Sequence, residues 1–255
     1  MIFFSNTQYL FPNTQYPLQA SVTVANLVAD YGNKPLIRNL SFTLTHPAFI
    51  AILGHNGSGK TTLLKALTRQ IPYRGTVLIG DHALTSRDHP VLDGSVALLG
   101  QHNQVGFSIP VRELVVMGRY RYKSFLEPYN AADYQAVEEA LRFLRMDHLA
   151  TADFRQLSGG EQQMVWLAQM MVQDAALFLL DEPTQHLDVR NKKQVFTLMQ
   201  QWVDQYRKTV LCVTHDLYNL FAMQGLLLNL SMPEPALEPI NESTLRRHIA
   251  WLEGD

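Results

Sequence analysis

The sequence has 255 residues, enough for one or two domains with a well-developed hydrophobic core. It carries 21 Lys and Arg against 23 Asp and Glu, and the resulting net charge of −2 argues against a general nucleic-acid coat protein. The single cysteine, Cys212, excludes a fold held together by intrachain disulfide bonds and favours a reducing compartment.

The first twenty residues differ from the rest of the chain. They contain the tetrapeptide Asn-Thr-Gln-Tyr twice, at 6–9 and 13–16, and we expect a poorly ordered extension, with a partner-binding arm as the alternative. The first charged residue is Asp30, so the start lacks the basic region of a secretory signal. No apolar run approaches the ~18 residues that a membrane-spanning helix needs. We therefore expect a protein kept in the cytosol.

Strand and helix patterns alternate beyond residue 20. Alternating or continuous apolar runs predict strands at 21–28, 40–44, 48–53, 76–79, 95–99, 177–180, 210–213 and 226–230. Helical spacing of apolar residues predicts helices at 61–69, 111–119, 131–145, 159–173, 189–206 and 241–252. The β–α–β rhythm is typical of an α/β domain with a mostly parallel sheet. We expect one domain over 21–255, with a helical insertion at 108–156 between two core segments, 21–107 and 157–255.

Residues 54–61, Gly-His-Asn-Gly-Ser-Gly-Lys-Thr, fit the pattern G-x-x-x-x-G-K-[ST] between a predicted strand and a predicted helix. The glycines allow the backbone to curl so that several N–H groups point at phosphate oxygens, and the following helix adds its positive N-terminus. In such a loop Lys60 reaches the β- and γ-phosphates, and the Thr61 hydroxyl ligates Mg²⁺. The predicted nucleotide ligands in this phosphate loop are Gly54, His55, Asn56, Gly57, Ser58, Gly59, Lys60, Thr61 and Thr62.

Two adjacent acids follow the apolar run at 177–180. Because ligands of such sheets bind at the carboxyl ends of the strands, we expect both side chains at the phosphate site. Asp181 is placed to hold Mg²⁺, directly or through water. Glu182 is placed to polarise the water that attacks the γ-phosphate.

The segment Leu-Ser-Gly-Gly-Glu-Gln at 157–162 distinguishes between classes of nucleotide-binding proteins. Kinases, GTPases and helicases share the phosphate loop, whereas this segment resembles the signature motif of the ATP-binding-cassette (ABC) ATPases. The resemblance covers about residues 21–220. It implies a P-loop NTPase fold with an N-terminal antiparallel β subdomain, and an enzyme that hydrolyses ATP with Mg²⁺ as cofactor.

The resemblance also implies that the signature motif acts across a dimer. In a head-to-tail, ATP-dependent homodimer, Ser158 and Gly160 of one protomer would close on the γ-phosphate held by Lys60 of the other. A further loop would cross the dimer interface at 187–188. The nucleotide contacts implied for the motif and for this loop are Ser158, Gly159, Gly160, Glu161 and Asp188.

Three further positions are similar to functional positions of the family. Tyr31 looks like the aromatic residue that stacks on adenine. Gln101 resembles the glutamine that senses Mg²⁺ and the attacking water, with Gln104 as the alternative. His215 resembles the histidine that contacts the γ-phosphate, and we expect it to act in catalysis together with Glu182.

The helical insertion indicates a branch of the family. Residues 109–120 are similar to a segment of the importers of iron chelates (iron-siderophore complexes), haem and cobalamin, and His55, residues 136–140 and the run Gln-His-Leu-Asp at 185–188 fit that branch. The resemblance implies an ATPase subunit that works with a separate permease and, indirectly, a substrate-binding protein. Its place would be the cytoplasmic face of a bacterial inner membrane. Zinc and manganese importers carry related segments, so the cargo stays open.

Other functions are disfavoured by particular residues. The run Arg-Tyr-Arg-Tyr-Lys at 119–123 interleaves bases with aromatic rings, as in proteins that bind single-stranded nucleic acid. Its small size and the negative net charge argue against that function, and we expect no nucleic-acid partner. An exporter subunit is a further alternative. An inactive regulatory module is disfavoured because Lys60, Asp181, Glu182 and His215 are all present.

The chain departs from the family pattern after His215. The family usually has a strand pair joined by a charged turn that ends in Asp-Gly, whereas Ser-Met-Pro-Glu-Pro stands here at 231–235. Met164 and Gln185 also replace residue types that are common in the family. We expect none of these departures to touch the phosphate chemistry, but the shape of the C-terminal edge stays open.

Overall fold

The computed structural model describes residues 21–30, 35–101, 103–124 and 126–254. The N-terminal extension and Tyr31 lie outside the described residues, so the expectations for both stay untested. In the described part of the chain, no helix has the length and apolar character that crossing a membrane requires.

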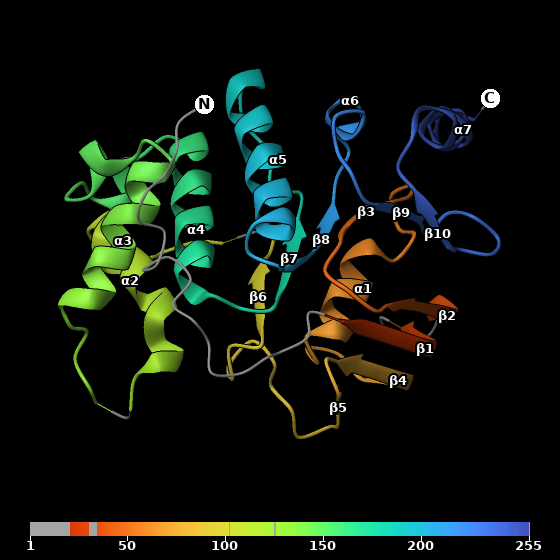
Figure 1. The fold of residues 1–255 in the computed structure, drawn as a ribbon, viewed down its shortest axis with the longest axis horizontal. Coiled ribbons are helices and arrows are strands. Elements are labelled where there is room, and N and C mark those ends of the chain that lie inside the picture. The colour runs from red at the N-terminus through yellow and green to blue at the C-terminus, as the bar shows by residue number, and fades with distance from the viewer. Residues whose placement is uncertain (1–20, 31–34, 102, 125, 255) are drawn as a thin grey trace.

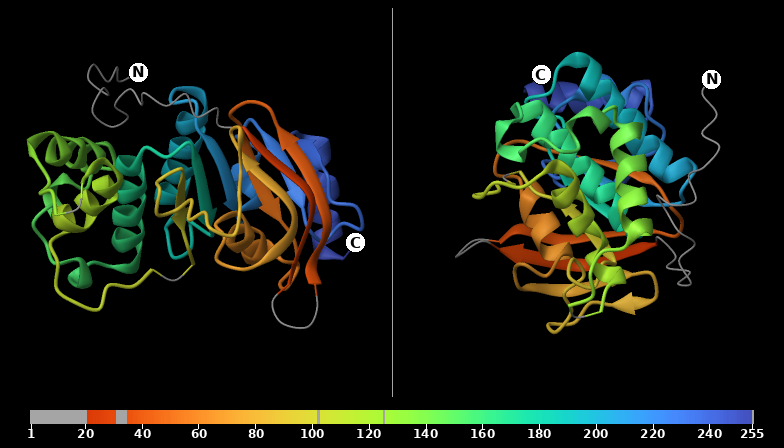
Figure 2. Two further views of the ribbon diagram at one scale, coloured as in Figure 1. Left: turned by 90° about the horizontal axis from the view of Figure 1, so that it is seen from below. Right: turned by 90° about the vertical axis from the view of Figure 1, so that its left-hand side faces the viewer.

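The strands form two sheets, with helix α1 (Lys60–Leu67) in contact with strands of both (Figures 1 and 2). The first sheet is antiparallel, in the order β2-β1-β4-β5, and consists of β1 (Val22–Asp30), β2 (Pro35–Leu44), β4 (Tyr73–Ile79) and β5 (His82–Ala83). The second has the order β10-β9-β3-β8-β7-β6 and consists of β3 (Phe49–Leu53), β6 (Val96–Leu99), β7 (Leu177–Asp181), β8 (Thr209–Val213), β9 (Leu226–Asn229) and β10 (Leu237–Pro239). Its strands pair in parallel except for β10, so the predicted α/β fold with an antiparallel N-terminal sheet is confirmed.

Continuous apolar runs explain why the second sheet is covered on both faces. Strands β3, β7 and β8 are buried along their whole lengths. Successive side chains of β3 enter two different cores: Ile50 and Ile52 pack with the antiparallel sheet and α1, whereas Phe49 and Leu53 pack with the helices of the other face. With both faces covered, the carboxyl edge is where a ligand can reach the strands.

The remaining helices flank this sheet. Helix α5 (Val189–Asp204), the short α6 (Leu217–Leu220) and α7 (Glu242–Glu253) follow β7, β8 and β10 along the chain. The helical part consists of α2 (Val111–Val116), the 3-10 helix η1 (Met117–Tyr122), α3 (Ala131–Phe143), the 3-10 turns η2 (Asp147–Leu149) and η3 (Phe154–Gln156), and α4 (Gly159–Gln173). Figure 1 shows these helices gathered at the left, with α4 nearest to the sheet.

The structure differs from the predicted elements most clearly at β2, in the helix predicted at 111–119 and at β10, and the short β5 and α6 were not predicted either. Strand β2 begins at Pro35 rather than near residue 40, because a register shift and the positive φ of Asn39 break the apolar alternation. Helix α2 ends at Val116, and the predicted helix continues as η1. The short β10 was not predicted, but it supplies the antiparallel partner of β9.

Gly118 allows η1 to lie against α4. A Cβ at this position would stand 2.5 Å from the Gln169 carbonyl oxygen and 2.7 Å from Val172 Cγ2. We expect Gly118→Ala to lower the free energy of unfolding by about 1–3 kcal/mol, because backbone must move to admit the methyl group. Gly106→Ala is the matched control, since a Cβ there meets no atom within 4 Å. Urea unfolding of both variants checks this, and equal stabilities would contradict the close approach.

Candidate active site

The parallel strands of the second sheet bring the predicted site residues to one edge. Strands β3 and β7 both pair with β8, and β6 pairs with β7, all in parallel (Figure 1). The residues that follow these strands therefore lie in neighbouring loops. They are the phosphate loop after β3, Gln101 after β6, Asp181 and Glu182 at the end of β7, and His215 after β8.

The phosphate loop has the tight curvature that its glycines predict. Gly54 and Gly59 have φ values of +147° and +98°, a backbone conformation that L side chains rarely adopt. Lys60 begins α1 directly after this turn. Its ammonium group donates hydrogen bonds to the Gly54 carbonyl at 2.7 Å and to the His55 carbonyl at 3.0 Å. The cation is thus held at the loop whose N–H groups are predicted to bind phosphate.

Thr61 and Asp181 meet although 120 residues separate them in the sequence. The threonine hydroxyl donates a hydrogen bond of 2.8 Å to Asp181 Oδ2. A hydroxyl oxygen and a carboxylate oxygen are ligands that Mg²⁺ prefers beside phosphate oxygens and water. The two side chains thus fit the magnesium ion that the sequence predicts.

Burial shapes the charges at this edge. It lowers the pKa of Lys60, which the nearby Glu182 and Asp181 carboxylates oppose. Burial raises the pKa of Asp181, and the hydrogen bond from Thr61 works in the other direction. Each buried charge is therefore compensated by a neighbour, which limits the cost of removing it from water.

Glu182 and His215 also come together as predicted. Glu182 Oε1 lies 3.3 Å from His215 Nε2. The backbone of Glu182 has a φ of +55°, and its N–H donates to the Val213 carbonyl at 3.0 Å, which ties the end of β7 to β8. A non-glycine residue in this left-handed region is strained, and such strain is common at functional sites. The arrangement directs a carboxylate and an imidazole to the same place.

The signature segment starts helix α4. Ser158 and Glu161 form a capping box: the Glu161 carboxylate accepts from the Ser158 hydroxyl at 2.6 Å and from its backbone N–H at 2.8 Å. Ser158 is exposed. Within the described residues, no hydrogen bond or ion pair joins this segment to the phosphate loop of the same chain. The structure therefore does not bring the two predicted anion sites together within one chain.

Gln101 and Asp188 have more peripheral positions. Gln101 and Gln104 are both exposed, beyond the end of β6. Asp188 caps the start of α5 by accepting a hydrogen bond of 2.7 Å from the Asn191 N–H. The position of Gln101 at the active edge agrees with its predicted role, which stays a prediction. Asp188 stabilises the start of α5 in this structure, and its predicted contact with nucleotide also stays a prediction.

Ser231 also belongs to this site, although no sequence motif indicates it. The backbone N–H of His55 in the phosphate loop donates a hydrogen bond of 2.8 Å to Ser231 Oγ. The unusual segment at 231–235 therefore reaches the backbone of the phosphate loop, and the expectation that it does not touch the phosphate chemistry stays a prediction. The only available signal was the departure from the family pattern, and it did not show where the chain would pass.

A protein-family model described as ABC transporter matches residues 37–185, more than half of the chain. The chain belongs to the ABC transporter family. It is the ATPase domain of an ABC transporter, and the family binds ATP. The phosphate loop and Asp181 both lie in the matched segment.

Individual ABC proteins are similar over most of the chain. The achromobactin transport ATP-binding protein of Dickeya dadantii is 34% identical over 77% of this chain and 74% of its own length. The manganese transport system ATP-binding protein of Halalkalibacterium halodurans is 34% identical over 82% of either chain. A solved structure of an ABC transporter assigned to the metal-chelate type, in an inward-facing conformation, is 27% identical, with a TM-score of 0.78 over 92% of this chain and 88% of that one.

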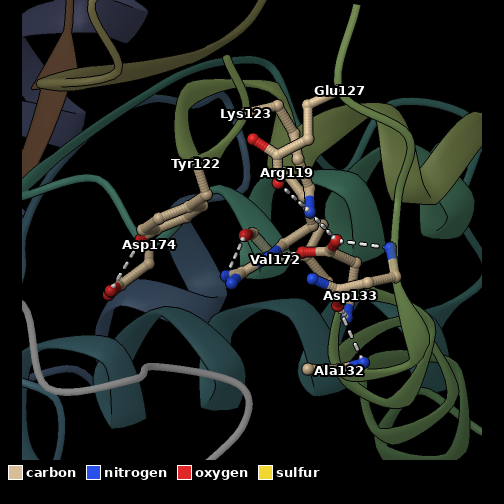
Figure 3. A network of polar contacts seen from close by, with 9 residues as sticks. Arg119, Tyr122, Lys123, Glu127, Ala132, Asp133, Val172 and Asp174 are labelled. Atoms are coloured by element: carbon tan, nitrogen blue, oxygen red, sulfur yellow. Dashed lines mark hydrogen bonds and ion pairs between the residues drawn. The ribbon is translucent and has the colours of Figure 1, made fainter.

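The basic and aromatic run at 119–123 lies inside the helical part of this ABC domain. Figure 3 shows Arg119 and Lys123 gathered at Asp133 of α3. Arg119 Nε lies 3.3 Å and Lys123 Nζ 2.5 Å from the Asp133 carboxylate, and Arg119 also donates to the Val172 carbonyl at 3.2 Å. Both cations are therefore used in contacts within the chain.

The other members of the run are likewise engaged. The Tyr122 hydroxyl donates to Asp174 at 3.1 Å, and burial together with that carboxylate raises the pKa of Tyr122 to about 12. Arg121 donates to the Gly94 carbonyl at 2.5 Å, and Tyr120 donates to a carbonyl of the same loop before β6. These contacts argue against the run at 119–123 as a nucleic-acid-binding site, because its rings and bases are engaged within the chain.

Asp133 is the acid on which the network depends. We expect Asp133→Ala to lower the free energy of unfolding by about 3–5 kcal/mol, because it leaves two enclosed cations without their carboxylate. Glu127→Ala is the control: Glu127 also contacts Lys123, but its side chain is 44% exposed, and its loss should cost less than about 1 kcal/mol. Denaturant unfolding compares the two, and a small effect of Asp133→Ala would show that the network adds little.

Proposed function

We propose that this chain is the ATP-hydrolysing subunit of an ABC importer that takes up a metal chelate through a separate permease. The observation that carries the proposal is the meeting of Lys60, Thr61, Asp181, Glu182 and His215 at one sheet edge. A cation, two acids and an imidazole at the mouth of a phosphate loop fit the hydrolysis of a nucleoside triphosphate.

The phosphate loop at 54–62 would bind the phosphates through backbone N–H groups other than that of His55, which donates to Ser231, with Lys60 turned to the β- and γ-phosphates. Tyr31 would stack on the adenine ring. When bound, Mg²⁺ would be held by Thr61 and Asp181, with Gln101 as a further ligand, and would offset the charge of the β- and γ-phosphates.

Glu182 is proposed as the general base. Its carboxylate would take a proton from a water molecule as the water oxygen bonds to the γ-phosphorus, and the bond from that phosphorus to the bridging oxygen would break, leaving ADP and phosphate. His215, 3.3 Å from this carboxylate, would orient it and contact the γ-phosphate. Catalysis would rest mainly on positioning and on stabilising charge.

A second copy of the chain would complete the site. The exposed start of α4 presents Ser158 and Gly159 to the outside, as a surface that closes on a partner's nucleotide would require. In this head-to-tail dimer, residues 158–161 and Asp188 would contact the ATP held by the partner protomer. The dimer would dock on the permease at the cytoplasmic face of a bacterial inner membrane. Its closure with ATP would open the permease toward a loaded substrate-binding protein, and hydrolysis with phosphate release would reopen the dimer.

The proposed cargo is a metal chelate, with iron complexes as the first candidates. Residues 109–120, which form α2 and most of η1, resemble chelate importers, and the metal-chelate type structure is similar along nearly the whole chain. Manganese is the second candidate, because the similar protein of Halalkalibacterium halodurans is named for manganese transport.

Glu182→Gln tests the catalytic assignment. We expect ATPase activity of the assembled transporter to fall by at least about 100-fold while ATP binding persists, because the amide cannot accept the proton. Glu242→Gln on α7 is the control, since that carboxylate is exposed and pairs with Arg246. Substantial turnover by Glu182→Gln would show that another group is the base.

Affinity purification of the Glu182→Gln protein with ATP from native membranes tests the partners. We expect a polytopic permease to be recovered with the chain, because trapped ATP keeps the dimer closed. Its absence, with ribosomes or DNA recovered in its place, would overturn the transport proposal. Uptake of radiolabelled ferric chelates and of manganese, in cells with and without the chain, then distinguishes the two cargo candidates.

A further inference from the structure

Ser231 reaches the phosphate loop because of strand register. Strand β9 pairs in parallel with β3, with Asn229 opposite Leu53, and the Leu230 N–H donates to the Leu53 carbonyl at 2.9 Å. The two segments that follow β3 and β9 continue side by side. The residue two places after Asn229 therefore lies beside the residue two places after Leu53. That pair is Ser231 and His55, joined by the 2.8 Å hydrogen bond from the His55 N–H to Ser231 Oγ.

Ser231 and Lys60 both bind the backbone of the phosphate loop at residues 54–55, but they bind different groups. Lys60 donates to the Gly54 and His55 carbonyls, whereas Ser231 accepts from the His55 amide. If Lys60 turns to the phosphates of ATP, as proposed above, those two carbonyls lose its hydrogen bonds. Among the described residues, Ser231 then still provides a side-chain interaction that keeps residue 55 in position.

Ser231 is itself held by a buried polar chain that leads to helix α7. Asn229 Oδ1 accepts from the Ser231 N–H at 2.9 Å, and Asn229 Nδ2 lies 3.1 Å from His248 Nδ1. Asn229 and His248 are each only 1% exposed. On the other side of the imidazole ring, His248 Nε2 lies 3.1 Å from Glu238 Oε1 on β10.

The hydrogen bonds define which ring nitrogen of His248 carries the proton. Because the Asn229 carbonyl oxygen accepts from Ser231, its amide nitrogen faces the imidazole and donates to His248 Nδ1. His248 therefore carries its proton on Nε2, which donates to the Glu238 carboxylate. Every link from β10 and α7 to the phosphate loop is thus satisfied with a single set of donors and acceptors, and buried polar chains of this kind fix one geometry.

We propose that Ser231 is a positioning residue of the ATP site, and that Asn229 and His248 hold it in place so that the C-terminal helix α7 contributes to ATP binding. The proposal rests on the nucleotide site proposed above. It gives a role to the segment at 231–235, in which the chain departs from the family pattern. Ser231 contacts the backbone of His55 and His248 contacts Asn229, so both would act through the backbone of the phosphate loop.

Binding of a fluorescent, non-hydrolysable ATP analogue with Mg²⁺ to the purified full-length chain tests the first link. We expect Ser231→Ala to raise the Kd about three- to tenfold, because the His55 amide loses its acceptor. Ser231→Thr keeps the hydroxyl and should stay within about twofold of the original chain. Ser243→Ala removes an exposed hydroxyl on α7 and is the matched control. Unchanged or tighter binding by Ser231→Ala would overturn the proposal.

A double-mutant cycle tests the second link. His248→Phe keeps a flat aromatic ring, somewhat larger than imidazole, but removes both nitrogens, and we expect it to weaken binding of the analogue by about two- to fivefold. If His248 acts through Ser231, the double variant with Ser231→Ala will bind no more weakly than Ser231→Ala alone. If the double variant instead raises the Kd by the product of the two single effects, His248 does not act through Ser231 and the proposed link to α7 is wrong. If His248→Phe does not fold, His248→Gln replaces it in the same cycle.

The reference variant Lys60→Ala separates this proposal from the one on which it rests. If Lys60→Ala abolishes binding of the analogue while Ser231→Ala binds normally, the nucleotide site stands and the role of Ser231 fails. If Lys60→Ala binds normally, the proposed nucleotide site itself is wrong.

Discussion

The parallel register of the second sheet is the constraint on which the rest of the structure depends. Strands β3, β6, β7 and β8 end at one edge, so loops far apart in the sequence meet there. A shift of one residue in any of these strands would turn buried side chains to the opposite face. The same apolar runs that fill the two cores therefore also set which residues share the active edge, and β9 adds Ser231 by the same rule.

Burial at this edge is tolerable because charges of opposite sign are enclosed together. Lys60 and Asp181 are both buried. Burial lowers the pKa of Lys60 and raises the pKa of Asp181, and both shifts favour the neutral form of the group. The neighbouring carboxylates counteract the shift at Lys60, and the hydroxyl of Thr61 counteracts the shift at Asp181. The helical part follows the same principle, since Arg119 and Lys123 are enclosed with Asp133. Stability and function thus depend on complete sets of partners rather than on single strong contacts.

Much of the fold could be predicted because its signals are local. The helix predicted at 159–173 is α4, and a capping box between Ser158 and Glu161 starts it. Long buried strands were equally clear from continuous apolar runs. The predictions were weaker where the pattern is short or interrupted, as at β10 and in β2, where Asn39 has a positive φ. There the pairing of distant strands, rather than the local sequence, decides the structure.

The phosphate loop and the acidic pair could be identified from the sequence alone, because closely spaced glycines, a lysine and a strand end specify their own backbone geometry and chemistry. The direction in which the run at 119–123 faces depends on the packing of the helices, since the same bases and rings could contact a ligand or an internal acid. The tertiary structure alone creates the polar chain from His248 to Ser231 and His55. That chain depends on the packing of segments that no local pattern connects, and hydrogen bonds between such segments form only once the sheet has set their positions.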